Sequence, residues 1–515
     1  MRRYAWFLPA GVALFVCYFM QSRSYGVNSD AAAQALQAWD MLHGNVLLNG
    51  WSLSDVSFYT TELPEYLLVE AVHGLGPDVV HICAALSYTL LVLLAAIVGR
   101  GKATGREGLV RALLAGGIMV APQLTPGTQV LLLQPDHTGT GVPLLLIFLL
   151  LDRLPARWFV PVIVFVGLTW VQIADSMATY AAAVPVVLVC GGQLAVQLLR
   201  RQPGHEPWRV WSEGGWFDGS LALAAAVSVL ATPVALELIH RIGGFWLHPV
   251  PESFAPLSAM PGHAWNLIKD VLILFGAGMF NAPAGLPMVL AVVHLVGFGL
   301  AVWAFCIAIW RFLAIDRLER ILLLGLLIVL AAGLLSTFMT GIGGTHEIAV
   351  VLPYAAVLAG RLLPVRLPAT RPAVVAAAVV AACYLASLGY DAAQPAAYAQ
   401  NQTLANWLEQ HGLTSGLAGY WQADEVRLDS GDAIKLAPLG NGTRASTWES
   451  KSAWFDPNLT YANFVVTVSG PPNEAIKARP AEAIEMFGKP ATIYRFGRYT
   501  VMVWHKNLLP ILKAY

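Results

Sequence analysis

The sequence predicts an α-helical polytopic membrane protein with a small extracytoplasmic α/β domain at its C-terminal end. Apolar residues make up 57% of the chain and charged residues only 12%, whereas about 25% charged is ordinary for a soluble domain. Apolar runs of membrane-spanning length recur up to residue 390, and the pattern after that point is polar and mixed. We therefore divide the chain into a transmembrane domain, 1–390, and an extracytoplasmic domain, 391–515.

The N-terminal segment is predicted to be a membrane anchor. Met1-Arg2-Arg3 precedes an apolar run that continues to Met20 without a small-residue cleavage pattern, so the segment should stay in the mature protein. The polar stretch that follows, 21–78, is unusually long for a connection between membrane helices. Against one basic residue, Arg23, it holds seven carboxylates: Asp30, Asp40, Asp55, Glu62, Glu65, Glu70 and Asp78. Such a loop is a candidate location for chemistry.

About eleven spans are predicted, since a helix needs roughly 20 residues to cross the hydrocarbon. Two of the runs are shorter than this and should borrow residues from their flanks. The eleven runs are 4–20, 79–99, 108–122, 141–151, 157–174, 178–199, 219–240, 286–309, 321–340, 347–362 and 373–390. A further segment, 264–276, has apolar residues at helical spacing and a polar opposite face, which predicts an interfacial helix on the outer surface.

The distribution of Lys and Arg predicts the orientation. Before residue 391, alternate loops carry seventeen basic residues, and the opposite loops carry only Arg23, Arg241 and Lys269. Because basic residues collect on the cytoplasmic side, we expect a multi-pass protein of the plasma membrane with a cytoplasmic N-terminus and an extracytoplasmic C-terminal domain. The acidic first loop is then extracytoplasmic.

Residues 391–515 are polar and free of cysteine. Their pattern predicts helices at 403–410 and 481–487 and strands at 425–428, 433–436, 464–469, 492–496 and 499–505. The whole chain has 31 basic and 31 acidic residues, and no basic patch that would favour nucleic acid as a partner. Each of the five cysteines lies singly in an apolar run and is predicted to be a small buried hydrophobe.

Asp30 is the carboxylate of the first loop with the most informative position. It lies at the start of a predicted surface helix, Ala31–His43, which Gly44 should end. It either caps this helix together with Ser29 or acts chemically. Asp40 lies about 80° around the helix from Asp30, so the two side chains need not converge. Asp40 suits a solvated face, and we keep it as a candidate substrate contact.

Other candidates lie in later loops on the same side. Asp136 and His137 belong to a short polar stretch, Gln134–Thr140, that fits a substrate or metal site and an ordinary turn equally well. Asp175 ends a span, where a carboxylate can meet water or face a site at the membrane surface. Arg241 is a rare outer cation that can pair with a phosphate or snorkel at the interface.

The last outer loop of the bundle combines Gly341, Gly343 and Gly344 with His346 and Glu347. Its backbone amides could hold a phosphate, and linker flexibility explains the glycines equally well. All of these candidates fall at the ends of spans on one side of the membrane, while the spans themselves carry almost no charge. This distribution predicts a site assembled at the outer membrane surface.

With these features the chain resembles the GT-C class of polytopic glycosyltransferases, which includes protein mannosyltransferases and aminoarabinose transferases. The resemblance rests first on topology: an N-terminal anchor with its start in the cytoplasm, about eleven spans, a later outer loop with an interfacial helix, and the C-terminal extracytoplasmic domain. It rests also on the first loop, in which Ser29-Asp30-Ala31 opens an amphipathic helix. By topology it covers the whole chain. By motif it covers little beyond this loop and, more loosely, His346-Glu347, Pro353-Tyr354 and Gly360-Arg361.

The resemblance implies transfer of a sugar from a polyprenyl-phosphate donor in the lipid bilayer to an extracytoplasmic glycan, lipid or protein, often with inversion. It implies that Asp30 is the catalytic base or orients it. Many members have an acidic pair here, whereas this chain has Ser29 before Asp30, which leaves open whether a divalent metal such as Mg²⁺ or Mn²⁺ takes part. The roles implied for the remaining candidates are acceptor or metal binding by Asp136, His137 and Asp175, and donor-phosphate binding by Arg241 and His346, with Glu347 beside it.

Two other functions remain open. A transporter or flippase of lipid-linked saccharides would usually keep ionisable residues at mid-span or show repeated halves, and neither is evident in the sequence. A non-catalytic membrane scaffold with a polymer-binding C-terminal domain is the third interpretation. Substitution of Asp30 separates the enzyme from both.

Overall fold

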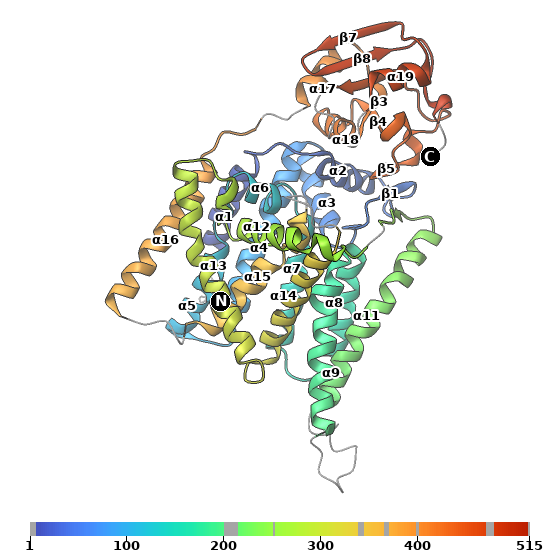
Figure 1. The fold of residues 1–515 in the computed structure, drawn as a ribbon. Coiled ribbons are helices and arrows are strands. Elements are labelled where there is room, and N and C mark those ends of the chain that lie inside the picture. Colours follow the sequence, from blue (N-terminus) through green and yellow to red (C-terminus); the bar gives the residue numbers. More distant parts are fainter. Residues whose placement is uncertain are drawn as a thin grey trace.

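The computed structural model describes residues 7–199, 215–250, 253–337, 344–364, 370–397, 401–469 and 478–512. A bundle of long helices forms one part, and a smaller α/β domain lies over one end of it (Figure 1). Most of the glycine-rich stretch expected near 341–344 lies outside the described residues.

Eleven helices coincide with the eleven predicted spans. Six are long and apolar enough to cross a membrane, namely Pro77–Arg100, Thr179–Leu199, Trp216–Arg241, Leu286–Trp310, Arg317–Leu335 and Arg371–Ala392, and two others, Phe7–Ser22 and Phe159–Ala174, are shorter apolar helices. The described chain is thus that of a multi-pass membrane protein. The eleven are α1 (Phe7–Ser22), α4 (Pro77–Arg100), α5 (Gly105–Met119), α7 (Asp136–Arg153), α8 (Phe159–Ala174), α9 (Val184–Leu199), α11 (Trp216–Arg241), α13 (Leu286–Trp310), α14 (Arg317–Leu335), α15 (Val351–Leu362) and α16 (Arg371–Ala392).

Several helix boundaries differ from the prediction by four to six residues, among them the starts of α7 and α15. Helix α7 begins at Asp136 rather than near 141, so most of the expected turn is helical. Hydropathy places its start too late because the polar residues of its first turns are buried against other polar groups instead of meeting water. Helix α15 begins at Val351, after the 3₁₀ turn His346–Ile348.

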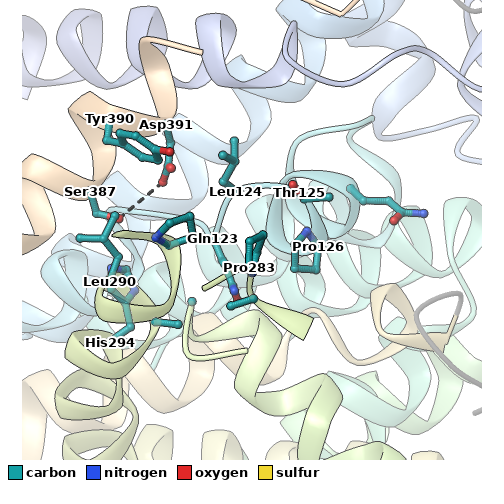
Figure 2. A pocket seen from close by; sticks show the side chains of 15 residues that line it. Gln123, Leu124, Thr125, Pro126, Pro283, Leu290, His294, Ser387, Tyr390 and Asp391 are labelled. Carbon is teal, nitrogen blue, oxygen red and sulfur yellow. Dashed lines mark hydrogen bonds between the residues drawn. The ribbon is translucent and has the colours of Figure 1, made fainter. Parts of the chain in front are cut away.

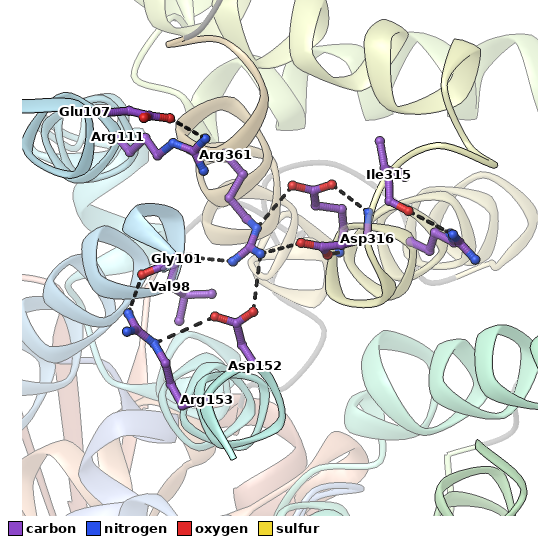
Figure 3. Close-up of polar contacts among 11 residues, drawn as sticks. Val98, Gly101, Glu107, Arg111, Asp152, Arg153, Ile315, Asp316 and Arg361 are labelled. Atoms are coloured by element: carbon purple, nitrogen blue, oxygen red, sulfur yellow. Dashed lines mark hydrogen bonds and ion pairs between the residues drawn. The ribbon is translucent and has the colours of Figure 1, made fainter. Parts of the chain in front are cut away.

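Helix α15 forms the centre of the bundle, and all of its residues are buried. Near its end, away from the α/β domain, Arg361 gathers three acidic side chains (Figure 3). Its guanidinium lies 2.6 Å from Asp316, 3.3 Å from Asp152 and 3.3 Å from Glu319, and Nη1 donates to the Val98 carbonyl at 3.1 Å. A buried cation needs such partners, and these join α4, α7, α14 and α15 at one end of the bundle.

The first loop folds over the other end of the bundle. It contains α2 (Ser29–Leu42), β1 (Trp51–Leu53) and α3 (Glu62–His73). Helix α2 begins as predicted next to Asp30, but its cap is Asn28, whose side chain accepts a hydrogen bond from the Ala31 amide. The predicted interfacial helix is α12 (Met260–Leu274), which runs crosswise to the long helices just beneath α2 and α3 in Figure 1. The short helix α6 (Pro126–Leu131) packs against it.

The C-terminal domain is a five-stranded mixed sheet with helices. The strand order is β4-β3-β6-β8-β7, and the parallel strands β4, β3 and β6 are followed by the antiparallel β8 and β7. The strands are β3 (Ser415–Gly419), β4 (Lys435–Leu439), β6 (Phe464–Val468), β7 (Thr492–Phe496) and β8 (Tyr499–Val503), and the helices are α17 (Gln402–Gln410), α18 (Tyr420–Asp429) and α19 (Pro480–Phe487).

One predicted strand of this domain is wrong. Residues 425–428 belong to helix α18, and the neighbouring strand β3 was not predicted. Nearly every residue of α18 is buried, because the helix lies between the sheet and α2 of the first loop. Apolar and charged residues alternate around the whole of α18, so its sequence lacks the period of an amphipathic helix.

The first loop and the C-terminal domain are joined through a small sheet. Strand β1 pairs in parallel with β2 (Trp246–Leu247) and antiparallel with β5 (Ser450–Lys451). Next to it, the Lys451 ammonium lies 2.9 Å from Asp40, which also accepts a hydrogen bond from the Trp51 indole at 2.7 Å. These contacts hold the C-terminal domain against the first loop.

Candidate functional site

Polar side chains from five segments meet at the end of the bundle that faces the C-terminal domain. Helix α2 supplies Asp30, the start of α7 supplies Asp136 and His137, the end of α8 supplies Asp175, and the 3₁₀ turn before α15 supplies His346 and Glu347. The fifth segment is the C-terminal domain itself. Of the eight side chains predicted for the site, six thus come together.

His137 is held by a buried carboxylate. Its Nδ1 lies 2.7 Å from the Asp175 Oδ2, which also accepts a hydrogen bond from Thr140 at 2.7 Å. The Met177 amide donates to the other Asp175 oxygen at 2.8 Å. Asp175 is therefore a fixed acceptor rather than a hydrated helix end. Because Nδ1–H donates to it, Nε2 of the neutral His137 ring keeps a lone pair for another ligand.

The free side of His137 faces the remaining members of the cluster. Its Nε2 lies 3.5 Å from Glu347 and 3.9 Å from Asp136. The His137 and His346 rings are nearly parallel, with centroids 5.4 Å apart. Ligand atoms of Asp136, His137 and His346 all lie within 4.8 Å of one another, which is close enough for one metal ion to bind all three. A histidine that donates its other N–H to a carboxylate is the usual arrangement for a metal ligand.

Asp30 is held from the C-terminal domain. The phenol of Tyr420 lies 2.5 Å from Asp30 Oδ1 and 2.7 Å from Glu449 Oε2. Burial raises the pKa of Asp30 to about 6, against the effect of the Tyr420 hydrogen bond, which favours the charged carboxylate. The charges of Asp136 and His346 also act on Asp30, so Asp30 and the histidine cluster belong to one site.

Three residues around the site have backbone conformations that L-amino acids rarely adopt. The φ angles of Phe58, Asp136 and Glu449 are +48°, +40° and +44°. Phe58 packs edge-on against His137, with ring centroids 5.8 Å apart. Strain of this kind persists only where the surrounding structure enforces it, and it collects at functional sites.

A groove with an apolar wall ends at the cluster. Its volume is about 350 Å³, and its polar end is formed by Asp55, His137, Asp175 and Glu347. Its walls come from the 3₁₀ turn His346–Ile348, the π-helical turn Thr179–Ala183, α14 and the segment 253–254. They are lined by Tyr180, Phe254, Val329, Ala332 and Leu335 among others. The hydrogen bond from the buried Thr345 to Asp270 of α12, 3.0 Å long, fixes the turn that carries Glu347. The groove suits a molecule with a polar head and an apolar tail.

Two predicted side chains do not join the cluster. Asp40 pairs with Lys451 and Trp51 between the first loop and the C-terminal domain. Arg241 pairs with Glu237 one turn before it on α11 and is largely exposed. Substrate roles for these two remain predictions that no contact in the described structure supports.

Three residues of the site were not singled out from the sequence. Glu62 is buried beside Thr140 at 3.4 Å. Tyr420 reaches Asp30 from the distant C-terminal domain, and Glu449 binds Tyr420. Glu62 had one available signal, because it is one of the acids of the first loop. The other two are ordinary polar residues in their local sequence, and only the fold brings them to the site.

A second pocket, of about 190 Å³, lies between α13, α16 and the segment 123–126 (Figure 2). Asp391 lines it and accepts a hydrogen bond from Ser387 at 3.5 Å. None of the residues predicted for the site is among its described lining residues.

The comparisons give structural but not sequence similarity. No family model and no curated protein sequence matches the chain. A crystal structure of the oligosaccharyltransferase of Archaeoglobus fulgidus with a tethered acceptor peptide matches 91% of this chain and 70% of its own, at 13% identity and a TM-score of 0.44. ArnT from Cupriavidus metallidurans in the apo state matches over the whole of both chains, at 13% identity and a TM-score of 0.40. These matches are GT-C membrane glycosyltransferases. At such values the function has to be argued from the residues of the site.

Proposed function

We propose that this protein is a membrane glycosyltransferase that moves a sugar from a polyprenyl-phosphate donor to an acceptor hydroxyl outside the cytoplasm. One observation carries the proposal: the groove with the apolar wall ends at His137 and Glu347, and the neighbouring Asp136 and His346 are close enough to Asp30 for their charges to act on it. A polyprenyl chain matches the groove, and its sugar phosphate would reach the polar end. The same geometry suits a lipid-linked donor better than a soluble sugar nucleotide, which has no apolar tail.

Asp30 is the proposed catalytic base. In the reaction it accepts the proton of the acceptor hydroxyl while the hydroxyl oxygen attacks the anomeric carbon. The bond between this carbon and the phosphate oxygen breaks, the sugar is transferred with inversion, and polyprenyl phosphate leaves. Asp30 is only partly buried, so an acceptor can approach it. A pKa of about 6 keeps most of this carboxyl ionised at neutral pH while leaving it more basic than an ordinary Asp.

The acidic surroundings of the groove repel a phosphate unless a cation is present. Asp55, Asp136, Asp175 and Glu347 all lie at its polar end or beside it. We propose that Asp136, His137 and His346 hold a divalent cation there, which would neutralise the charge of the donor phosphate. Of the two ions considered, Mn²⁺ suits two imidazoles and a carboxylate better than Mg²⁺, which takes oxygen ligands. The residues fit this role because His137 is oriented by Asp175 and presents Nε2 to the other two.

The test uses the purified protein in nanodiscs with synthetic polyprenyl phosphates that carry mannose or aminoarabinose. Release of polyprenyl phosphate is measured in the presence of acceptor extracts from the cell envelope. We expect Asp30→Asn to lower the rate by about 10² to 10⁴. Asp78→Asn is the matched control, because this acid of the same loop pairs with the half-exposed Arg23 and its substitution should leave the rate unchanged.

Two further arms complete the experiment. EDTA should abolish release by the wild-type protein and Mn²⁺ should restore it, whereas a rate that resists chelation contradicts the cation site. Equal rates for Asp30→Asn and the wild type would rule out Asp30 as the base. If no donor is cleaved and fluorescent lipid-linked saccharide instead crosses vesicles that contain the protein, the flippase interpretation replaces the enzyme.

A further inference from the structure

The phenol of Tyr420 joins two acidic side chains that are 419 positions apart in the chain. It lies 2.5 Å from Asp30 in the first loop and 2.7 Å from Glu449 in the C-terminal domain. A phenol has a single proton to donate. Two ionised carboxylates therefore cannot both bind it, and one of them must be neutral and donate its own proton to the phenol oxygen.

Burial and charge identify Glu449 as the neutral partner. Glu449 is 4% exposed, whereas Asp30 is only partly buried. The acids that face Glu449 are Asp30, Asp136 and Asp424, and they disfavour a further negative charge. In this arrangement the Glu449 carboxyl donates a hydrogen bond to the Tyr420 oxygen, and the Tyr420 hydroxyl donates a hydrogen bond to Asp30.

We propose that Tyr420 and Glu449 are positioning residues for Asp30, so that the C-terminal domain completes the catalytic site. The inference rests on the proposed role of Asp30 as the base. With Oδ1 occupied by Tyr420, Asp30 Oδ2 has no hydrogen bond among the described residues and is the oxygen left for an acceptor hydroxyl. A free carboxylate would rotate, whereas this one keeps a fixed orientation, which is what proton transfer in a transition state requires.

The backbone around these three side chains is fixed independently of them. Ser29, next to Asp30, donates its hydroxyl to the Tyr420 carbonyl at 2.7 Å. Glu449 has a φ of +44° and directly precedes β5, which pairs with β1 of the first loop. Helix α18, which starts at Tyr420, packs along α2, which carries Asp30. Both elements of the contact are thus held in register by backbone interactions.

The experiment measures kcat and the acceptor KM for variants of the full-length protein. Tyr420→Phe keeps the ring and removes the hydroxyl, and we expect kcat to fall about tenfold with the KM within twofold. Glu449→Gln can still donate a proton to the phenol, so it should keep nearly the wild-type kcat, whereas Glu449→Leu should match Tyr420→Phe. Lys435→Met is the control for loss of a charge in the same domain, because Lys435 is exposed at the start of β4 and its substitution should leave kcat unchanged.

A double-mutant cycle separates this inference from the proposed function. Tyr420→Phe should cause no further loss in the Asp30→Asn background, because a positioning residue acts only through Asp30. If Asp30→Asn is inactive while Tyr420→Phe is as active as the wild type, the inference fails and the base remains. If Asp30→Asn is fully active, the proposed base fails. A Tyr420→Phe variant with a lowered melting temperature and an additive loss would show a structural role only, which also overturns the inference.

Discussion

The side chain of Asp30 is buried in part and still accessible to another molecule. Its Oδ1 is bound to Tyr420, its side chain stays partly exposed, and burial raises its pKa to about 6. Asp175, in contrast, is fully buried and orients the imidazole of His137. The different surroundings of the two carboxylates suit them to the different roles that we propose.

The raised pKa of Asp30 predicts how activity depends on pH. A general base works in its ionised form, so the active fraction falls as pH drops through the folded-state pKa of about 6. We expect kcat/KM to be flat above pH 7 and to fall about tenfold per pH unit well below pH 6. Release of polyprenyl phosphate measured between pH 4.5 and 8 checks this. A profile that stays flat down to pH 5, where an ordinary Asp would still be ionised, contradicts the shifted pKa.

At the scale of elements, the close approach of α3 and α7 shapes the site. Gly139 of α7 faces the buried Glu62 of α3, and a Cβ on Gly139 would lie 2.5 Å from the Glu62 Oε1. The missing side chain therefore lets Glu62 lie beside Thr140, which in turn binds Asp175. The glycine is part of the site although it has no functional group.

This contact predicts the effect of Gly139→Ala. The added methyl group cannot be accommodated unless the buried Glu62 side chain shifts or α3 and α7 separate, and overpacking of this kind costs about 1 to 3 kcal/mol. We expect a lower melting temperature in detergent and a reduced transfer rate. Gly117→Ala is the matched control, because a Cβ there meets nothing within 4 Å. Equal melting temperatures for the wild type and Gly139→Ala would mean that the Glu62 side chain or the two helices move at no cost, and would contradict the prediction.

For the whole molecule, the sequence predicts the helices better than the site. A backbone in lipid has to satisfy its hydrogen bonds internally, so long apolar runs such as Pro77–Arg100 could be read directly as helices. Helix α18 could not, because it is buried on all sides. Asp30, Asp136 and His346 were recognisable from their places at span ends, but the contact between Asp30 and Tyr420 joins residues 390 positions apart. No local pattern in the sequence encodes that contact.

The orientation of the molecule is the property that the proposed reaction most depends on. The site and the C-terminal domain lie at the same end of the bundle, and the distribution of basic residues predicts that this end lies outside the cytoplasm. We expect a membrane-impermeant maleimide to label Gln410→Cys in intact cells, since this residue is exposed at the end of α17. Ala156→Cys, exposed between α7 and α8 at the opposite end, should react only after the cells are opened. The reverse pattern would put the site in the cytoplasm, where an extracytoplasmic acceptor could not reach Asp30.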